Sequence, residues 1–502
     1  MTRNHHHEAD TRSFRHLADQ AFARSAGAPL TLGNRVELLF DSTENFPAWA
    51  AAIEAARESV MIEMYLFADD RYGRQLRNLL SEKAKAGVRV YLLYDAIGCW
   101  REHFNGFFKP LRAAGAAVRA YNPINPTAGL ALLGRNHRKL IVVDQSEAFI
   151  SGLCVSARWQ GDAERQRAPW RDTGARLSGP IVGEAIAAFA DSWAASGSPL
   201  AEPPAGPIIQ EGNVAARLIA TTPATAHMMR LDLLITSFAR RSLWLTDAYF
   251  MGTSLYLSAL KQAARDGVDV RLLVPRSSDI SWIATVSRTL YRPLLEAGVR
   301  VFEWNGPMIH AKTAVADGRW ARIGSSNLNL SSWLANRELD VAIEDESIAS
   351  AMELKFIEDL QQATEIVLRG QHRRPVLSQP REVDLAQSAL ELMQPSSTAR
   401  RASAAARQAA RISDALGAVV RGTRPVENSE AASFLSIGIV LLALALLIGY
   451  FPQLVALPLA LGLVLTGGGI VLRALALIWN RHQKRSDGSA DTSGEQGKTG
   501  RD

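Results

Sequence analysis

The chain is poor in cysteine and lacks an apolar run near its first residue. Its 502 residues include two cysteines, Cys99 and Cys154, too few for a disulfide framework, which favours a reducing compartment. Residues 1–27 are polar without an apolar core, so we expect no secretory signal peptide. Neither sign of charge dominates. The formal net charge of +6 is compatible with anionic lipid or nucleic acid and selects neither.

What the chain does contain is a long internal repeat. The segments 33–39, 85–93 and 111–115 resemble, in the same order, the segments 212–218, 265–273 and 294–298. Within each half, buried-strand patterns alternate with helical spacing. We expect strands at 60–67, 88–94, 243–250 and 268–274, and helices at 72–86 and 254–266. Such alternation predicts an α/β fold of two similar domains, each a mostly parallel or mixed sheet flanked by helices.

The length and the changes of composition divide the chain into six segments. At 502 residues, two or more domains are expected. We predict an N-terminal extension at 1–32, a first domain at 33–200, a second at 201–370, a linker with a basic helix at 371–430, an apolar hairpin at 431–473 and a basic, disordered tail at 474–502.

Two apolar segments near the C-terminus predict contact with a membrane. Residues 431–451 and 454–472 are each about 20 residues long, enough to cross a hydrocarbon core of about 30 Å. Arginines and lysines on both flanks predict a transmembrane hairpin whose ends and preceding domains are cytoplasmic. A re-entrant hairpin and a buried helix pair are the alternatives. An Ala/Arg-rich stretch at 399–420 is either a solvated linker helix or a helix lying on anionic headgroups.

One motif, H-x-K-x4-D, occurs in both halves. Its first copy is His137, Lys139 and Asp144; its second copy is His310, Lys312 and Asp317. Residues two apart on a strand share a face, so each imidazole should lie beside its lysine. Four cationic or protonatable groups brought to one place would repel one another unless an anion sat there, and a phosphate diester fits. Two imidazoles also suit covalent phosphoryl transfer, in which one attacks phosphorus and the other protonates the leaving oxygen.

Small residues follow each motif. The second half reads Gly-Ser-Ser-Asn at 324–327, where Ser325 and Asn327 could donate hydrogen bonds to phosphate oxygens; a tight structural turn is the alternative. The first half reads Ser-Gly-Leu-Cys at 151–154, and the thiol of Cys154 is a weak donor. We therefore expect phosphate binding mainly from the turn of the second half.

Each half also carries a later acid. Asp172 and Glu338 each follow an arginine, so they are either orienting partners for the imidazoles or members of ion pairs with that arginine.

These residues identify a resemblance to the phospholipase D superfamily, whose mark is the duplicated H-x-K-x4-D followed by a Gly/Ser-x-Asn turn. Residues 33–368 resemble bacterial cardiolipin synthases and related phospholipase D-like proteins more narrowly. The chain departs from the family pattern at Ser151 and Cys154, and its apolar segments lie at the C-terminus instead of the N-terminus.

The resemblance implies a phosphatidyltransferase that needs no metal or other cofactor. It would make cardiolipin from phosphatidylglycerol at the bacterial inner membrane through a phosphatidyl-histidine intermediate. The resemblance implies His137 as nucleophile, His310 as acid and base, and Lys139, Lys312 and Asn327 as holders of the phosphate oxygens. The alternatives are a phospholipase D that releases phosphatidic acid, a nuclease of the same superfamily and a non-catalytic scaffold. The nuclease would need a basic, aromatic-rich surface, which the sequence does not show, so we expect no nucleic-acid partner. The sequence does not fix the oligomeric state.

Overall fold

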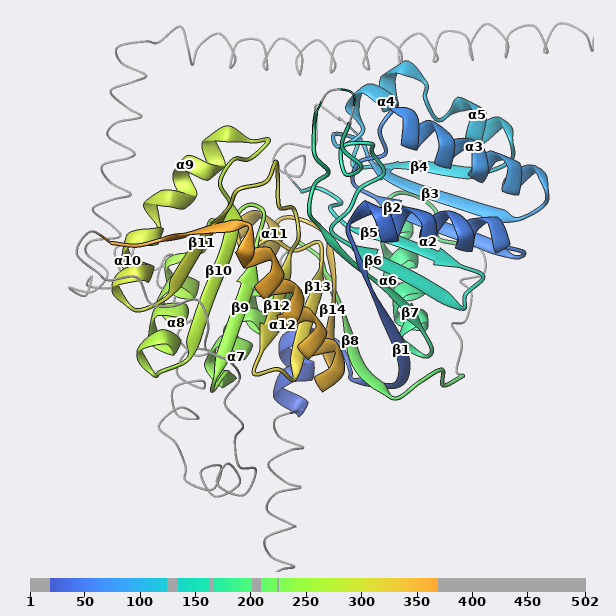
Figure 1. Cartoon of the computed structure of the whole chain (residues 1–502). Coiled ribbons are helices and arrows are strands. Elements are labelled where there is room, and N and C mark those ends of the chain that lie inside the picture. The colour runs from blue at the N-terminus through green and yellow to red at the C-terminus, as the bar shows by residue number, and fades with distance from the viewer. Residues whose placement is uncertain are drawn as a thin grey trace, which may run out of the picture. The chain divides into compact units, whose positions relative to one another are not determined.

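The computed structural model describes residues 19–123, 134–162, 164, 166–200, 209–223 and 225–368. Both halves of the repeat belong to one compact unit (Figure 1). Among these residues no helix is long and apolar enough to cross a bilayer. The predicted linker, apolar hairpin and tail, at 371–430, 431–473 and 474–502, lie outside the described residues.

The two halves repeat one order of strands and helices, to which the second half adds α11 and β15. The first half comprises β1 (Thr31–Phe40), α2 (Asp41–Ala55), β2 (Ser59–Met64), α3 (Arg71–Lys85), β3 (Arg89–Asp95), α4 (Trp100–Asn105), α5 (Lys109–Ala113), β4 (Ala117–Tyr121), β5 (Lys139–Val143), β6 (Glu147–Ser151), β7 (Thr173–Ser178) and α6 (Ile181–Ala195). The second half comprises β8 (Val214–Thr221), α7 (His227–Phe238), β9 (Ser242–Thr246), α8 (Ser254–Arg265), β10 (Asp269–Pro275), α9 (Ser281–Thr289), α10 (Tyr291–Glu296), β11 (Arg300–Trp304), β12 (Thr313–Ala316), β13 (Trp320–Gly324), α11 (Leu330–Leu334), β14 (Glu338–Glu344), α12 (Glu346–Gln361) and β15 (Ala363–Ile366).

The strand order is nearly symmetric about the contact between β1 and β8. It runs β15-β11-β10-β9-β12-β13-β14-β8-β1-β7-β6-β5-β2-β3-β4, so each half contributes the same sequence of neighbours in opposite direction. Within each half three strands are parallel, β2-β3-β4 and β9-β10-β11, and the others pair antiparallel. The prediction of a duplicated α/β fold with a mixed sheet is confirmed.

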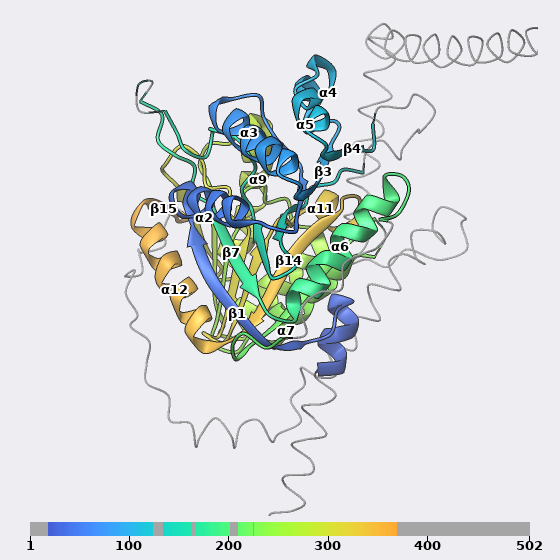
Figure 2. The same cartoon turned by 90° about the vertical axis from the view of Figure 1, so that its right-hand side faces the viewer.

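Each half-sheet is buried on both faces. On β5, Ile141 and Val143 join the core beneath the first half's helices, whereas Leu140 and Val142 face a core shared with the second half. That shared core also contains Val315 of β12 and Leu339 of β14. Figure 2 turns the first half toward the viewer, with α12 and α6 on opposite sides of the strands β1 and β7. The alternation expected from the sequence places both motif strands in the centre of this arrangement.

The predicted strands 60–67 and 243–250 end earlier than expected, at Met64 and Thr246. Their next residues leave the ladder, and this turns the rings of Tyr65 and Tyr249 toward the two motif histidines. Because regular pairing stops at these strand ends, Tyr65 and Tyr249 are free to lie beside the motif histidines.

Candidate active site

The two motif histidines are held by the opposite half of the molecule. The backbone N–H of His137 donates to the carbonyl of Arg337 at 2.9 Å, and that of His310 donates to the carbonyl of Arg171 at 2.7 Å. Each arginine immediately precedes one of the predicted acids. The main-chain pairing therefore brings each histidine beside the acid of the other half.

The side chains follow the same crossed pattern. The Nδ1 atom of His137 lies 2.9 Å from Glu338 Oε2, and the Nδ1 atom of His310 lies 2.8 Å from Asp172 Oδ2. A carboxylate at Nδ1 accepts the proton on that nitrogen, so the lone pair of the neutral ring is on Nε2. The structure thus decides between the two expectations for these acids: both contact imidazoles.

The adjacent arginines pair elsewhere. Arg171 bonds Asp359 of α12 at 2.9 Å, and Arg337 bonds Asp191 of α6. Both contacts cross the duplication, because Arg171 belongs to the first half and Asp359 to the second. These ion pairs hold in place the segments that carry the two acids. Because the arginines bind other carboxylates, those of Asp172 and Glu338 are available to the histidines.

Further hydrogen bonds orient each acid. Glu338 accepts from the Ser325 hydroxyl at 2.6 Å and from Asn336 at 3.2 Å. Asp172 accepts from the Trp159 indole at 2.9 Å, and its carboxylate presses so closely on Gly152 that a Cβ there would lie 2.2 Å from Oδ1. The small residues of the two turns therefore position the acids. Gly152 leaves room for the carboxylate of Asp172, and Ser325 donates a hydrogen bond to Glu338.

Burial and hydrogen bonding decide the charge of these acid–histidine pairs. Although burial opposes it, the bonds to His310 and His137 lower the pKa of Asp172 and of Glu338, so both acids are ionised. Burial lowers the pKa of His137, and burial together with the charge of Lys312 lowers the pKa of His310 to about 4. The lowered pKa values favour neutral imidazoles near neutral pH, with the lone pair of each ring on Nε2.

The two motif lysines lie beneath the histidines. Lys139 donates to the carbonyl of His137 at 2.6 Å, and Lys312 donates to the carbonyl of His310. Each ammonium also lies near a tyrosine ring, that of Tyr65 or Tyr249. Burial lowers the pKa of both lysines, that of Lys312 to about 8. Neither lysine lines the pocket, so in this state they supply positive charge from below.

The motif aspartates lie at the far ends of the two strands, away from the histidines. Asp144 accepts hydrogen bonds from the backbone N–H groups of Arg57, Glu58 and Ser59. Asp317 does the same for Arg240, Arg241 and Ser242. Neither aspartate lines the pocket. Their position does not support the expectation that these aspartates are catalytic. Each one binds the backbone at the start of a neighbouring strand, β2 or β9.

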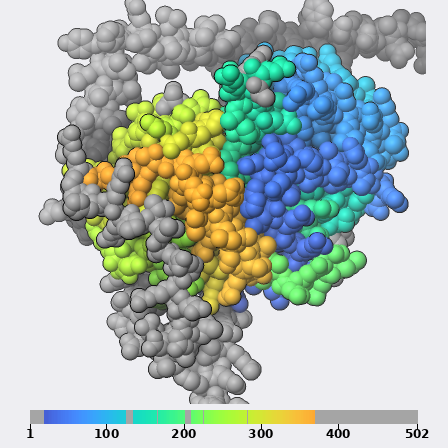
Figure 3. All heavy atoms as spheres, viewed as in Figure 1, coloured from blue at the N-terminus to red at the C-terminus, as the bar shows by residue number. Residues whose placement is uncertain are grey.

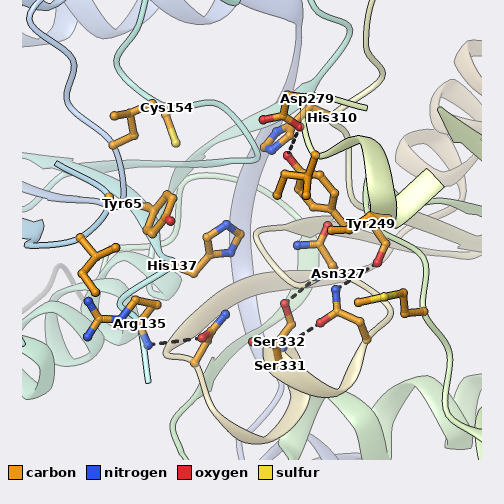
Figure 4. A pocket seen from close by; sticks show the side chains of 18 of the residues that line it. Tyr65, Arg135, His137, Cys154, Tyr249, Asp279, His310, Asn327, Ser331 and Ser332 are labelled. Atoms are coloured by element: carbon orange, nitrogen blue, oxygen red, sulfur yellow. Dashed lines mark hydrogen bonds between the residues drawn. The ribbon is translucent and has the colours of Figure 1, made fainter. Parts of the chain in front are cut away.

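His137 and His310 line one pocket of about 560 Å³ at the meeting of the two halves. Figure 4 shows both rings with Tyr65, Tyr249 and Asn327 around the same space. Asn327 is 3% exposed, and within the described part of the chain its Oδ1 atom has no hydrogen-bond partner. A buried amide that lines a pocket and lacks a partner is well placed to bind a ligand.

The turns of the two halves are not equivalent at this pocket. Ser325 is buried and binds Glu338, so it does not reach the pocket as a phosphate donor in this state. Cys154 does line the pocket, in the first half, where the second half has Asn327. Burial raises the pKa of the Cys154 thiol, which keeps it neutral. The asymmetry predicted from the sequence therefore appears as an amide on one side and a thiol on the other.

Sequence reasoning missed the aromatic residues around the histidines. Tyr65 packs edge-on against His137, with ring centroids 4.9 Å apart, and Trp159, Trp170 and Tyr249 surround His310. A signal was present for the tyrosines, which follow equivalent strands of the repeat. The sequence pattern did not single out the two tryptophans.

Comparison with known proteins agrees with this architecture. The crystal structure of phosphatidylserine synthase from Haemophilus influenzae Rd KW20 superposes with a TM-score of 0.55 at 13% identity, covering 69% of this chain and 91% of that one. This likeness shows a shared fold. A family described as "Cardiolipin synthase, PLD-like domain" matches residues 49–159 and 234–360, one segment in each half.

Proteins with similar sequences identify the family more closely than the fold does. Cardiolipin synthase of Geobacillus kaustophilus is 33% identical over 375 residues, which cover 73% of each chain. Cardiolipin synthase A of Pseudomonas entomophila is 32% identical over 369 residues, covering 71% of this chain and 76% of that one. The chain belongs to the cardiolipin synthase family of phospholipase D-like proteins.

Proposed function

We propose that this protein is a phosphatidyltransferase that joins two molecules of phosphatidylglycerol into cardiolipin and releases glycerol. The observation that carries the proposal is the pair of acid-supported imidazoles, His137 and His310, on one pocket. The two lysines beneath, and the side chain of Asn327, whose NH2 group can donate to a phosphate oxygen, suit an anionic phosphodiester at the same place. The family relationship supports the lipid substrate.

In the first step, Nε2 of His137 attacks the phosphorus of one phosphatidylglycerol. A nitrogen–phosphorus bond forms, the bond from phosphorus to the glycerol headgroup oxygen breaks, and His310 gives that oxygen a proton. His310 must be protonated to act as this acid. The bound phosphodiester favours its protonation, because an anion beside the ring offsets the charge of Lys312 that lowers its pKa.

In the second step, the headgroup hydroxyl of another phosphatidylglycerol attacks the phosphatidyl-histidine. His310, now neutral, takes the hydroxyl proton, the nitrogen–phosphorus bond breaks, and cardiolipin leaves. Lys139, Lys312 and Asn327 stabilise the charge on the non-bridging oxygens in both steps. Glu338 and Asp172 hold the ring orientations and support the imidazolium form.

We also propose that the protein acts at the bacterial inner membrane, with its catalytic unit on the cytoplasmic side. This rests on the predicted hairpin at 431–473 and on the positive residues at its flanks. The substrates are themselves membrane lipids, which makes such an attachment useful.

The direct test uses purified full-length protein in mixed micelles with phosphatidylglycerol and no added metal. The proposal predicts cardiolipin and glycerol in equal amounts, and none from His310→Ala. Phosphatidic acid as the sole product would identify a hydrolase. Turnover of nucleic acid alone would identify a nuclease, and no turnover of any diester would leave a scaffold.

A further inference from the structure

Two short helices expose large aromatic and aliphatic side chains. On α4, Trp100 is 49% and Phe104 65% exposed, and their rings contact each other with centroids 4.7 Å apart. On α9, Trp282 is 58% and Val286 39% exposed. In each helix the two residues are four apart and so lie on one face. Exposed apolar groups gathered in this way mark an interaction surface.

The same feature occurs in both halves of the duplication. The α4 helix lies between β3 and β4, and α9 lies between the equivalent strands β10 and β11. The two tryptophans are 182 positions apart (282 minus 100), within the repeat offsets of 180 at Gly87 and Gly267 and 183 at Gly115 and Gly298. Figures 1 and 2 show both helices at the same end of the unit. The apolar groups therefore occupy equivalent places beside the shared pocket.

This apolar surface continues into the pocket. Ile97, Ile280 and Trp282 are exposed to solvent, and all three also line the cavity that contains the two histidines. Figure 3 shows the outer surface of the unit, in which the two halves adjoin. A molecule with an apolar tail could thus pass from the surface to the histidines along apolar side chains.

The charges beside this surface suit an anionic partner. Arg101 of α4 and Arg158 of the pocket rim are exposed, and neither has an acidic partner within the described ranges. The exposed carboxylate of the rim, Asp279, accepts a hydrogen bond from the Tyr249 hydroxyl at 2.8 Å. Tryptophan and phenylalanine flanked by arginine form the composition that inserts into the headgroup region of a bilayer.

We propose that α4 and α9 dock the catalytic unit on a bilayer that contains anionic phospholipid, with Trp100, Phe104, Trp282 and Val286 inserted at headgroup depth. The pocket mouth then opens onto the membrane surface, and a lipid headgroup reaches the histidines while its acyl chains stay in the bilayer. The choice of a bilayer as occupant rests on the proposed function. This contact is separate from the predicted hairpin at 431–473, because it is made by the catalytic unit itself.

The location of the helices can be measured without any turnover. Cys99 is buried, and Cys154, which lines the pocket, is replaced by Ala in every labelled protein, so a single new surface cysteine can be labelled selectively with a bimane fluorophore. Full-length Phe104→Cys and Trp282→Cys are labelled and placed on phosphatidylglycerol-containing vesicles whose lipids carry a nitroxide in the acyl chain. Leu354→Cys on α12, which is 70% exposed, is the matched control.

Docking predicts strong quenching at positions 104 and 282 and little at 354. Equal quenching at all three positions, or none at 104 and 282, overturns the proposal. A label at 104 or 282 that is already shielded from aqueous iodide before vesicles are added, in a concentration-dependent way, would assign the surface to a second protein copy and also overturn it.

A second measurement tests whether docking serves substrate access. Trp100→Ser with Phe104→Ser changes two residues outside the pocket lining. Cardiolipin formation from vesicles should fall about tenfold. Turnover of a short-chain, water-soluble phosphatidylglycerol should stay within about twofold, and Leu354→Ser should change neither. Equal losses on both substrates, or no loss on vesicles, would contradict docking. A wild-type protein inactive on both substrates would instead refute the proposed function, and the fluorescence result would still stand.

Discussion

His137 is hydrogen-bonded to Glu338, a residue 201 positions away in the other half of the duplication. The reciprocal bond joins His310 to Asp172, 138 positions away. Neither half therefore contains a complete acid–histidine pair, and the site exists only when the two halves are assembled. This crossing explains why the main-chain bonds from His137 to Arg337 and from His310 to Arg171 matter for the chemistry.

The crossed pairing predicts which histidine each acid controls. Both acids act to raise the pKa of the ring they contact. Glu338→Gln should thus lower the pKa of His137 and leave that of His310 nearly unchanged, and Asp172→Asn should do the reverse. NMR titration of protein labelled at histidine measures this. Each substitution should also lower kcat by about 10²–10⁴-fold. A shift confined to the histidine of the same half would contradict the pairing.

Filling the pocket with an anion should raise the pKa of His310. Burial and the charge of Lys312 lower that pKa to about 4, so binding of inorganic phosphate should be coupled to proton uptake near pH 6. Calorimetry in buffers of different ionisation enthalpy measures the protons taken up. Lys312→Met should weaken phosphate binding. It should also reduce the proton uptake, because without the charge of Lys312 the pKa of His310 is already higher before phosphate binds. Binding without proton uptake would argue against His310 as the proton carrier.

The same lowered pKa has a consequence for stability. Between about pH 4 and the ordinary histidine value near 6.5, the unfolded chain binds a proton that buried His310 does not. The free energy of unfolding should therefore decrease as pH falls through this window. Urea unfolding at several pH values measures the effect, and His310→Gln should flatten the curve there. A curve of unchanged slope in that variant would be inconsistent with a buried neutral ring.

The two turns should differ in their importance for catalysis. Asn327 lines the pocket and its side-chain NH2 group can donate to a phosphate oxygen, whereas the Cys154 thiol at the corresponding place is a weak donor. Asn327→Ala should lower kcat about 10²-fold, as the removal of a hydrogen bond to a charged transition state does. Cys154→Ala should keep activity within about threefold. Steady-state kinetics on both variants would reject the asymmetry if the losses were equal.

The motif aspartates should matter for stability more than for chemistry. Asp144 accepts three backbone N–H groups and adopts a positive φ of 46°. Asp144→Ala should lower the free energy of unfolding by about 1–3 kcal/mol, because three backbone N–H groups lose a charged acceptor. Asp144→Asn, which keeps one acceptor and tolerates this backbone conformation, should lose less. Unfolding in urea together with kcat per folded molecule measures both. A large fall in kcat at unchanged stability would show instead that Asp144 takes part in catalysis.

The sequence predicted the parts of the site that depend on periodicity and repetition. Alternating burial on β5 and the repeat offsets were enough to place His137 and His310 just before the equivalent strands β5 and β12. The crossed pairing was not predictable, because it depends on how the halves face each other and not on the spacing within either. The inward turn of Tyr65 after Met64 likewise follows from tertiary packing, since the apolar pattern continues past the point where pairing ends.

The covalent step is the central claim, and rapid-quench mass spectrometry tests it most directly. The full-length wild type should form the intermediate in every turnover, so quenching during the first turnovers should trap it. After mixing with phosphatidylglycerol and quenching at alkaline pH, the peptide that contains His137 should carry the mass of a phosphatidyl group, and His137→Ala should show none. A phosphatidyl group found on His310 in the wild type, or cardiolipin formed with no modified histidine at any time, would contradict the account.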